Sequence, residues 1–94
     1  MLQLTLYGRT YCHLCEDMRV ALEPLQREFP FIVHEVDVDA DLELESRFGE
    51  RVPVLVAMGP EGPRELCHYF LDALAVRTWL AAQACAGTAT SGRA

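Results

Sequence analysis

The feature that most constrains the fold of this chain is a pair of cysteines, Cys12 and Cys15, at the junction of two different periodic patterns. Before the pair, residues 2–7 alternate between apolar and polar side chains, which is typical of a strand with one buried face. From Cys12 or His13 to about Glu28, apolar residues recur at helical spacing, which indicates an amphipathic helix. A C-x-x-C pair beside a β-α-β pattern is typical of a redox motif.

The rest of the chain predicts three more strands and two more helices. Runs rich in β-branched or apolar residues indicate the strands, and helical spacing indicates the helices. The expected strands cover residues 31–38, 52–58 and 65–70, and the expected helices cover 39–48 and 72 to about 84. The nearly continuous apolar run at 52–58 predicts a strand that is buried on both faces. Asp72 is placed to cap the last helix.

Taken in order, these elements predict an α/β fold with the order β-α-β-α-β-β-α. The first strand–helix–strand unit has to be parallel and right-handed, and the short turn after Met58 makes the last two strands an antiparallel hairpin. We therefore expect a four-stranded mixed sheet flanked by helices, in one domain over residues 1–85. Residues 86–94 are small and polar without periodicity, and we expect them to form a disordered tail.

Composition narrows the possible functions. The 94 residues are 51% hydrophobic, which is enough for a core without disulfide staples. The formal net charge is −6 and the chain has no lysine, which disfavours nucleic acid binding because that depends on clustered cations. No apolar run reaches the roughly 18 residues that a membrane span needs, and no signal-peptide pattern is visible. We expect a cytoplasmic monomer that binds neither nucleic acid nor membrane.

The two cysteines of the pair are expected to have unequal roles. At the start of a helix, Cys12 meets free backbone N–H groups and the positive end of the helix dipole, which stabilise a thiolate. Cys15 lies one turn further along the same face, so a disulfide can close, and we expect Cys15 to be the more buried. Arg9 and a protonated His13 would favour the Cys12 thiolate further, whereas the carboxylates at 16 and 17 would oppose it. Cys12 is therefore predicted to attack and Cys15 to resolve.

Two other interpretations of these cysteines compete with the redox one. The pair could be buried structural thiols, a common state of free cysteine, although its placement at a helix start favours redox chemistry. Cys12, His13 and Cys15 together with Cys67 or His68 could imitate a zinc site, but a zinc ribbon needs a second well-spaced pair. We therefore expect no metal site, and we expect Cys67 and Cys85 to be core or surface thiols.

Three segments of the chain are similar to one known family. They are 6–15, with the strand, loop and C-x-x-C pair; 36–39, at the end of the second strand; and the Val-Pro-Val at 52–54. Over residues 1 to about 85, the chain resembles the glutaredoxin-like group of the thioredoxin superfamily. The resemblance implies a thioredoxin fold with a cis Val52–Pro53 bond beside the cysteines. It also implies that the Val52 backbone pairs with the substrate as an added strand.

The resemblance implies a set of site residues and a reaction. Cys12 and Cys15 are the expected catalytic residues of thiol–disulfide exchange. The expected substrate-binding residues are Tyr7, Arg9, Tyr11, His13, Val52 and Pro53. We expect that no cofactor is bound. Glutathione or a thioredoxin-type reductase is the expected reductant, and a disulfide-containing protein or a small thiol is the expected substrate. A thioredoxin-like binding module with little turnover and a thiol-based redox or metal sensor are the alternative functions.

The chain departs from the glutaredoxin pattern at positions that matter for glutathione. His13 and Leu14 stand between the cysteines, where glutaredoxins usually have Pro-Tyr. Tyr69 and Phe70 stand ahead of Asp72, where the family has a Gly-Gly pair that helps to hold glutathione. Two large side chains would hinder the approach of a tripeptide to the last helix, so we predict weak glutathione binding.

Overall fold

The computed structural model describes residues 2–93, with side chains over residues 2–83. Its elements, in chain order, are β1 (Leu2–Gly8), α1 (His13–Glu28), β2 (Phe31–Asp37), the short 3-10 helix η1 (Val38–Ala40), α2 (Leu42–Phe48), β3 (Val54–Gly59), β4 (Gly62–His68) and α3 (Ala73–Arg93). Apart from the addition of η1, this is the predicted order of strands and helices. The predicted α/β fold class is therefore confirmed.

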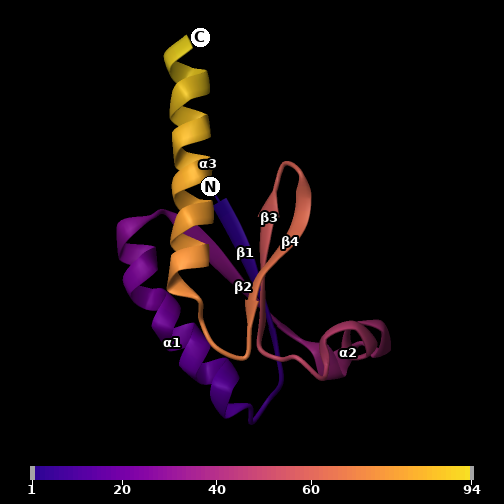
Figure 1. The fold of residues 1–94 in the computed structure, drawn as a ribbon. Coiled ribbons are helices and arrows are strands. Elements are labelled where there is room, and N and C mark those ends of the chain that lie inside the picture. The colour runs from indigo at the N-terminus through magenta and orange to yellow at the C-terminus, as the bar shows by residue number, and fades with distance from the viewer. Residues whose placement is uncertain (1, 94) are drawn as a thin grey trace.

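The four strands form one mixed sheet in the order β2-β1-β3-β4 (Figure 1). β1 runs parallel to β2, with Leu2 opposite Phe31, so that β1, α1 and β2 form the predicted β-α-β unit. β3 is antiparallel to both β1 and β4, and the pair of β3 and β4 is the predicted hairpin. The strand that leads into the two cysteines, β1, is therefore a central strand with a neighbour on each side.

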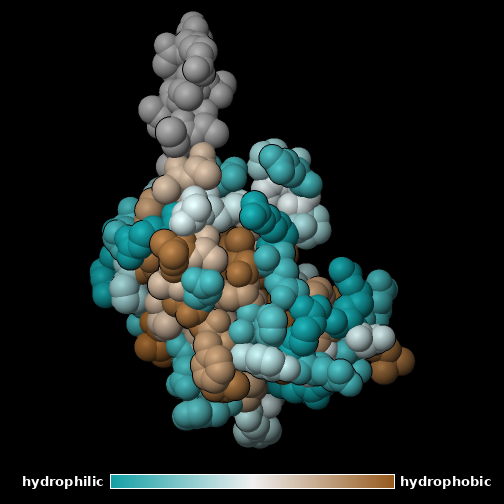
Figure 2. All heavy atoms as spheres, viewed as in Figure 1, coloured by the Kyte–Doolittle hydropathy of each residue, from teal (hydrophilic) through white to brown (hydrophobic). Residues whose placement is uncertain are grey.

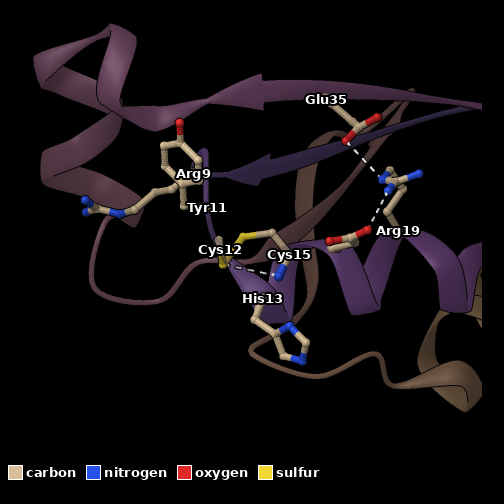
Figure 3. Close-up of a pocket in the computed structure, with 8 residues that line it drawn as sticks. Arg9, Tyr11, Cys12, His13, Cys15, Arg19 and Glu35 are labelled. Carbon is tan, nitrogen blue, oxygen red and sulfur yellow. Dashed lines mark hydrogen bonds and ion pairs between the residues drawn. A yellow bond between two sulfur atoms is a disulfide. The ribbon is translucent and has the colours of Figure 1, made fainter.

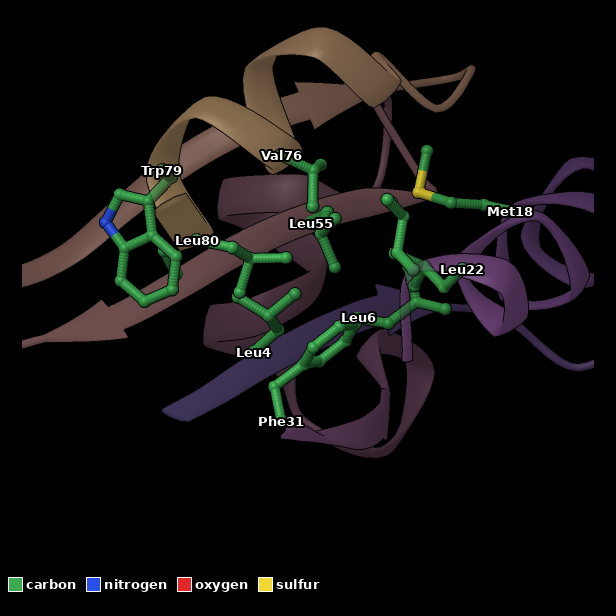
Figure 4. Packing of buried hydrophobic residues seen from close by; sticks show 11 residues of the cluster. Leu4, Leu6, Met18, Leu22, Phe31, Leu55, Val76, Trp79 and Leu80 are labelled. Atoms are coloured by element: carbon green, nitrogen blue, oxygen red, sulfur yellow. The ribbon is translucent and has the colours of Figure 1, made fainter. Parts of the chain in front are cut away.

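The sheet is covered by α1 and α3 on one face and by α2 on the other (Figure 1). The larger core cluster joins α1 and α3 to the sheet (Figure 4), and its buried members are Leu4, Leu6, Met18, Leu22, Leu25, Phe31, Leu55, Ala57, Val76, Trp79 and Leu80. The smaller cluster lies under α2 and contains Val38, Phe48, Val54 and Val56. Successive residues of β3 enter the two clusters in alternation, which confirms a strand buried on both faces.

Aspartates begin two of the helices. Asp72 Oδ1 accepts a hydrogen bond from the Ala75 N–H at 3.0 Å, which confirms the predicted cap of α3. Asp41 accepts hydrogen bonds from two N–H groups in the first turn of α2. Because the Asp41 backbone is extended, with a φ of −145°, the helix predicted over 39–48 is divided into η1 and α2.

The last hairpin is shifted toward its turn relative to the sequence pattern. β3 starts at Val54, two residues after the start of the strand predicted over 52–58. β4 starts at Gly62, three residues before the start of the strand predicted over 65–70. Gly62 has a φ of +98° and pairs with Gly59, so the ladder reaches the turn itself. The early part of β4 was not predicted because it contains Pro63, which strands tolerate mainly at a sheet edge.

α3 continues to Arg93, beyond the end near Ala84 that the sequence pattern indicates. The backbone over 86–93 is helical, which differs from the expected disordered tail over 86–94. No proline interrupts this segment, but its two glycines lower its helix propensity and it lacks the apolar periodicity on which the prediction depended. The boundary of a folded domain at residue 85 stays a prediction.

The surface differs between the two ends of the sheet. It is mostly hydrophilic around α2, where Leu42 is the exposed exception, whereas apolar residues gather around the connection from β4 to α3 (Figure 2). Phe70 and Leu74, on either side of the Asp72 cap, are exposed. Over residues 2–93, none of the helices combines the length and the apolar character that crossing a membrane requires.

Candidate active site

Cys12 lies in the loop between β1 and α1 and caps the helix. Its backbone is extended (φ −94°, ψ 111°), and its sulfur accepts a hydrogen bond from the Cys15 N–H at 3.2 Å. Its carbonyl oxygen accepts the Glu16 N–H, also at 3.2 Å, which closes the first turn of α1. The sulfur therefore occupies the place of an N-cap oxygen, where free N–H groups and the helix dipole favour negative charge.

Cys12 and Cys15 form a disulfide, with their Cα atoms 5.2 Å apart. A Cβ added to Gly8, the last residue of β1, would lie 2.9 Å from Cys15 Sγ, so this glycine leaves the room that the sulfur needs. Both cysteines are half-buried, and the greater burial expected for Cys15 stays a prediction. The two sulfurs differ in their surroundings, because Cys15 Sγ lies against Gly8 of β1 and Cys12 sits at the helix tip.

The disulfide opens onto a surface pocket of about 550 Å³ (Figure 3). Its walls are Arg9, Tyr11, Cys12, His13, Cys15, Glu16, Arg19 and Glu35. Of the predicted substrate-binding residues, Arg9, Tyr11 and His13 are thus brought together with both cysteines. A second hollow of about 300 Å³ shares part of these walls and extends along β1 and β2 to Asp37.

The guanidinium group of Arg9 points away from the disulfide (Figure 3). It binds Asp39 at 3.0 Å and Glu45 at 3.2 Å, and it donates to the Gly49 carbonyl oxygen at 3.1 Å. These contacts tie the loop before Cys12 to η1 and to the end of α2. The two carboxylates also counter the positive charge that the sequence led us to expect beside the Cys12 sulfur.

Arg19 lines the pocket between two carboxylates, a role that the sequence pattern did not predict. Its guanidinium nitrogens lie 3.6 Å from Glu16 Oε1 and 3.7 Å from Glu35 Oε1 (Figure 3). The i, i+3 spacing of Glu16 and Arg19 was the local signal for the first contact. The contact with Glu35 depends on the fold, because it joins α1 to β2. Acidic charge is therefore placed close to the disulfide from two elements.

The aromatic and imidazole side chains near the cysteines differ in their surroundings. Tyr11 is fully exposed and has a φ of +64°, a left-handed conformation that is uncommon outside glycine. His13 is exposed, and its Nε2 lies 3.5 Å from the Asp17 carboxylate. An imidazole ring adds positive charge only when it is protonated. Tyr7 belongs to the cluster under α2, where its ring stacks on Phe48 with the centroids 4.4 Å apart. Tyr7 therefore lies outside the pocket.

Val52 and Pro53 also lie outside the walls of the pocket. Their peptide bond is cis, the isomer that the family resemblance implies. The buried Pro53 accepts the Tyr69 N–H at its carbonyl oxygen, and the Tyr69 hydroxyl donates to the Glu50 carbonyl oxygen, both at 2.9 Å. Tyr69 thus holds the loop over 50–53 through two hydrogen bonds. Its φ of +63° lies in the left-handed region that favours glycine. The family's Gly-Gly pair at this place was the only sequence signal for this backbone conformation.

Cys67 is free and half-buried. Burial raises the pKa of its thiol; a hydrogen bond to the Asp72 backbone opposes this shift, and the charges of Asp72 and Glu65 add to it. A protonated thiol is a poor nucleophile, so Cys67 is not favoured as a second reactive thiol. Cys85 lies outside the residues whose side chains are described. Among the described side chains, no group of His, Cys, Asp and Glu is placed to hold a metal ion.

The mixed sheet, with a C-x-x-C disulfide at the start of α1, defines the class: this is a thioredoxin-fold protein. A family model described as "Glutaredoxin-like domain (DUF836)" matches residues 3–81. The chain therefore belongs to this glutaredoxin-like family, and the resemblance stated from its motifs is confirmed. A comparison with curated proteins found no match.

Several solved structures are similar to this chain. Protein Ne2328 from Nitrosomonas europaea is 40% identical, with a TM-score of 0.75, over 84% of this chain and 91% of that one. Protein XcR50 from X. campestris is 46% identical, with a TM-score of 0.59, over 84% of this chain and 96% of that one. A mutant thioredoxin from Halobacterium salinarum NRC-1 is 25% identical, with a TM-score of 0.64, over 84% of this chain and 71% of that one. The fold and the cysteine pair together indicate thiol redox chemistry.

Proposed function

We propose that this chain is a thiol–disulfide oxidoreductase that works by dithiol exchange through Cys12 and Cys15. The observation that carries the proposal is the position of Cys12 Sγ, which caps α1 and is bonded to Cys15. A sulfur in this place is stabilised as a thiolate when the disulfide is reduced. Membership of the glutaredoxin-like family and the open pocket beside both sulfurs support the same function.

The proposed reaction starts from the reduced dithiol. The Cys12 thiolate attacks one sulfur of a substrate disulfide and forms a mixed disulfide, while the other substrate sulfur leaves as a thiolate and takes up a proton. The Cys15 thiol then loses its proton and attacks Cys12 Sγ, which breaks the mixed disulfide and releases the second substrate thiol. The substrate gains two electrons and two protons, and the Cys12–Cys15 disulfide remains as in the structure.

An external thiol donor completes the cycle in this proposal. Glutathione or a thioredoxin-type reductase supplies the two electrons, no cofactor is built into the chain, and disulfide-containing proteins or small thiols are the substrates. The cytoplasm is the proposed compartment, because its thiol pools keep such a dithiol reduced.

Glutathione itself is expected to be a weak ligand. Tyr69 and Phe70 place two exposed, large side chains where the family has Gly-Gly. We expect slow turnover in a glutathione-coupled mixed-disulfide assay, and faster turnover for Phe70→Gly, which removes one side chain and leaves the Tyr69 hydrogen bonds in place. Wild-type turnover comparable to that of an ordinary glutaredoxin would contradict this expectation.

Insulin reduction with dithiothreitol as the donor tests the proposed function. We expect the wild-type chain and the control Cys67→Ser to accelerate precipitation of reduced insulin, and Cys12→Ser to remove the acceleration. When the pre-reduced Cys15→Ser variant is mixed with insulin after the dithiothreitol has been removed, it should accumulate a mixed disulfide on Cys12 that is visible by mass spectrometry. A wild-type chain that binds disulfide-containing proteins without accelerating their reduction would instead be a binding module.

A further inference from the structure

We infer that the pocket beside the disulfide selects substrates whose disulfide is flanked by basic residues. This inference rests on the proposed function and names the chemical class of its substrate. It starts from two ion-pair groups, one centred on Arg19 and one on Arg9, in each of which two carboxylates contact one arginine of the pocket wall.

The first ion-pair group surrounds Arg19. Its single positive charge faces the carboxylates of Glu16 and Glu35, at 3.6 and 3.7 Å. These distances are longer than those of charge-assisted hydrogen bonds, and both carboxylates are largely exposed. Each carboxylate therefore keeps lone pairs for a donor on a partner molecule, and the group as a whole retains one negative charge on the wall of the pocket.

The second ion-pair group surrounds Arg9 and does not compensate for the first. Asp39 and Glu45 bind its guanidinium group closely, and the Gly49 carbonyl oxygen accepts a further hydrogen bond from it. The group again sets one positive charge against two negative ones. This guanidinium group points away from the disulfide (Figure 3) and already binds two carboxylates. It is therefore not available to bind an acidic group of the substrate.

Other features of the rim also suit a cation. The adjoining hollow extends to Asp37, whose carboxylate accepts hydrogen bonds from the Asp39 N–H and the Thr10 hydroxyl. The fully exposed ring of Tyr11, one residue before Cys12, offers an aromatic face of the kind that attracts guanidinium and ammonium groups. His13 is the remaining basic side chain on the rim, and its Nε2 lies 3.5 Å from the Asp17 carboxylate. A basic side chain beside the substrate disulfide therefore meets attraction here, and an acidic one meets repulsion.

A matched set of peptide disulfides tests this inference. Each peptide carries one cysteine, flanked by arginine, glutamine or glutamate, and is used as its symmetric disulfide. For the reduced wild-type chain we expect the arginine peptide to react about tenfold faster than the glutamate peptide at low salt, with glutamine in between. The ratio should fall to about twofold or less at roughly 0.5 M salt, because screening shortens the reach of these charges.

Variants of the first ion-pair group make the test specific. Glu16→Gln and Glu35→Gln should each lower the arginine-to-glutamate ratio about threefold, whereas Glu61→Gln, at the distant β3–β4 turn, should leave it unchanged. Arg19→Gln should raise the ratio, which is the opposite of what general damage to the pocket would do. The ratio is compared rather than the rate, because losing Glu16 also changes the reactivity of Cys12 toward every substrate.

The outcomes separate this inference from the proposed function. Exchange with a neutral hydroxyethyl disulfide depends only on the dithiol, so its absence would overturn the proposed function. Normal exchange with that disulfide, together with equal rates for the three peptides or a preference for glutamate, would overturn the inference alone. An arginine preference that does not respond to salt or to the Arg19 and Glu35 substitutions would also overturn it.

Discussion

Cys12 and Cys15 are three residues apart, yet their sulfurs meet different neighbours. Cys12 Sγ faces the N–H groups that begin α1, and Cys15 Sγ lies against Gly8. In Cys15→Ser, we predict that alkylation of Cys12 by iodoacetamide reaches half its maximal rate below the pH of about 8.5 that is typical of a free thiol. Cys12→Ser is the matched comparison, and its Cys15 should react more slowly. A faster Cys15, titrating at lower pH, would show that the roles are reversed.

The Cys67 thiol makes the free energy of unfolding depend on pH in the alkaline range. Because burial raises the pKa of its thiol, the folded state holds this proton more tightly than the unfolded chain does. The resulting stabilisation is complete below the pKa of the unfolded thiol and is lost as the pH rises through the folded-state pKa. We therefore predict that the free energy of unfolding of the oxidised protein falls between about pH 8 and pH 10.

Urea unfolding of the wild type and of Cys67→Ala at both pH values checks this prediction. The disulfide keeps the other two described cysteines from titrating, so the comparison isolates one thiol. The variant should show a weaker fall than the wild type. If both lose the same free energy of unfolding, the dependence belongs to other groups.

Among the helices, α3 depends on a cap that is easily tested. Asp72 accepts the Ala75 N–H in its first turn. Asp72→Ala should lower the free energy of unfolding by about 1 kcal/mol, because the N–H loses its acceptor, and Asp72→Asn should retain most of the stability because asparagine also caps helices. The midpoint of urea unfolding measures both. An asparagine variant as unstable as the alanine variant would mean that the charge, rather than the cap, stabilises the helix.

The helices and strands that carry the cysteines were predictable because their signals are local. Alternation marks β1, helical spacing marks α1, and the cysteines fall between them. The contacts that shape the pocket were not predictable, because they join distant parts of the chain. Arg9 reaches Gly49, which is 40 residues away, and Glu35 reaches the pocket only because β2 lies beside β1. The longer α3 was missed because its last turns lack an apolar stripe.

The described sheet has two edges, β2 and β4, and both carry residues that oppose pairing with another copy. β2 exposes His34 and Glu35 along one edge, and β4 exposes Pro63 and Arg64 along the other. Charged residues and proline on edge strands oppose strand addition, and the net charge of −6 adds repulsion between copies. We predict a monomer, to be measured by size-exclusion chromatography with light scattering over a range of concentrations.

A dimer would contradict this prediction and would direct attention to the exposed Phe70 and Leu74. If these apolar side chains formed the interface, Phe70→Ser combined with Leu74→Ser would restore the monomer. A dimer that survives both substitutions would instead be joined through a sheet edge, despite its charges.

The close fit between Gly8 and the Cys15 sulfur also makes this glycine a spectroscopic reporter. No side chain separates the backbone of β1 from Cys15 Sγ, so conversion of the disulfide to a thiol changes the electronic surroundings of the Gly8 peptide directly. Glycine amide nitrogens resonate apart from most others in a nitrogen–proton correlation spectrum. The oxidation state can therefore be followed at one isolated resonance, and a titration in a glutathione redox buffer would yield the midpoint potential without an added dye or label.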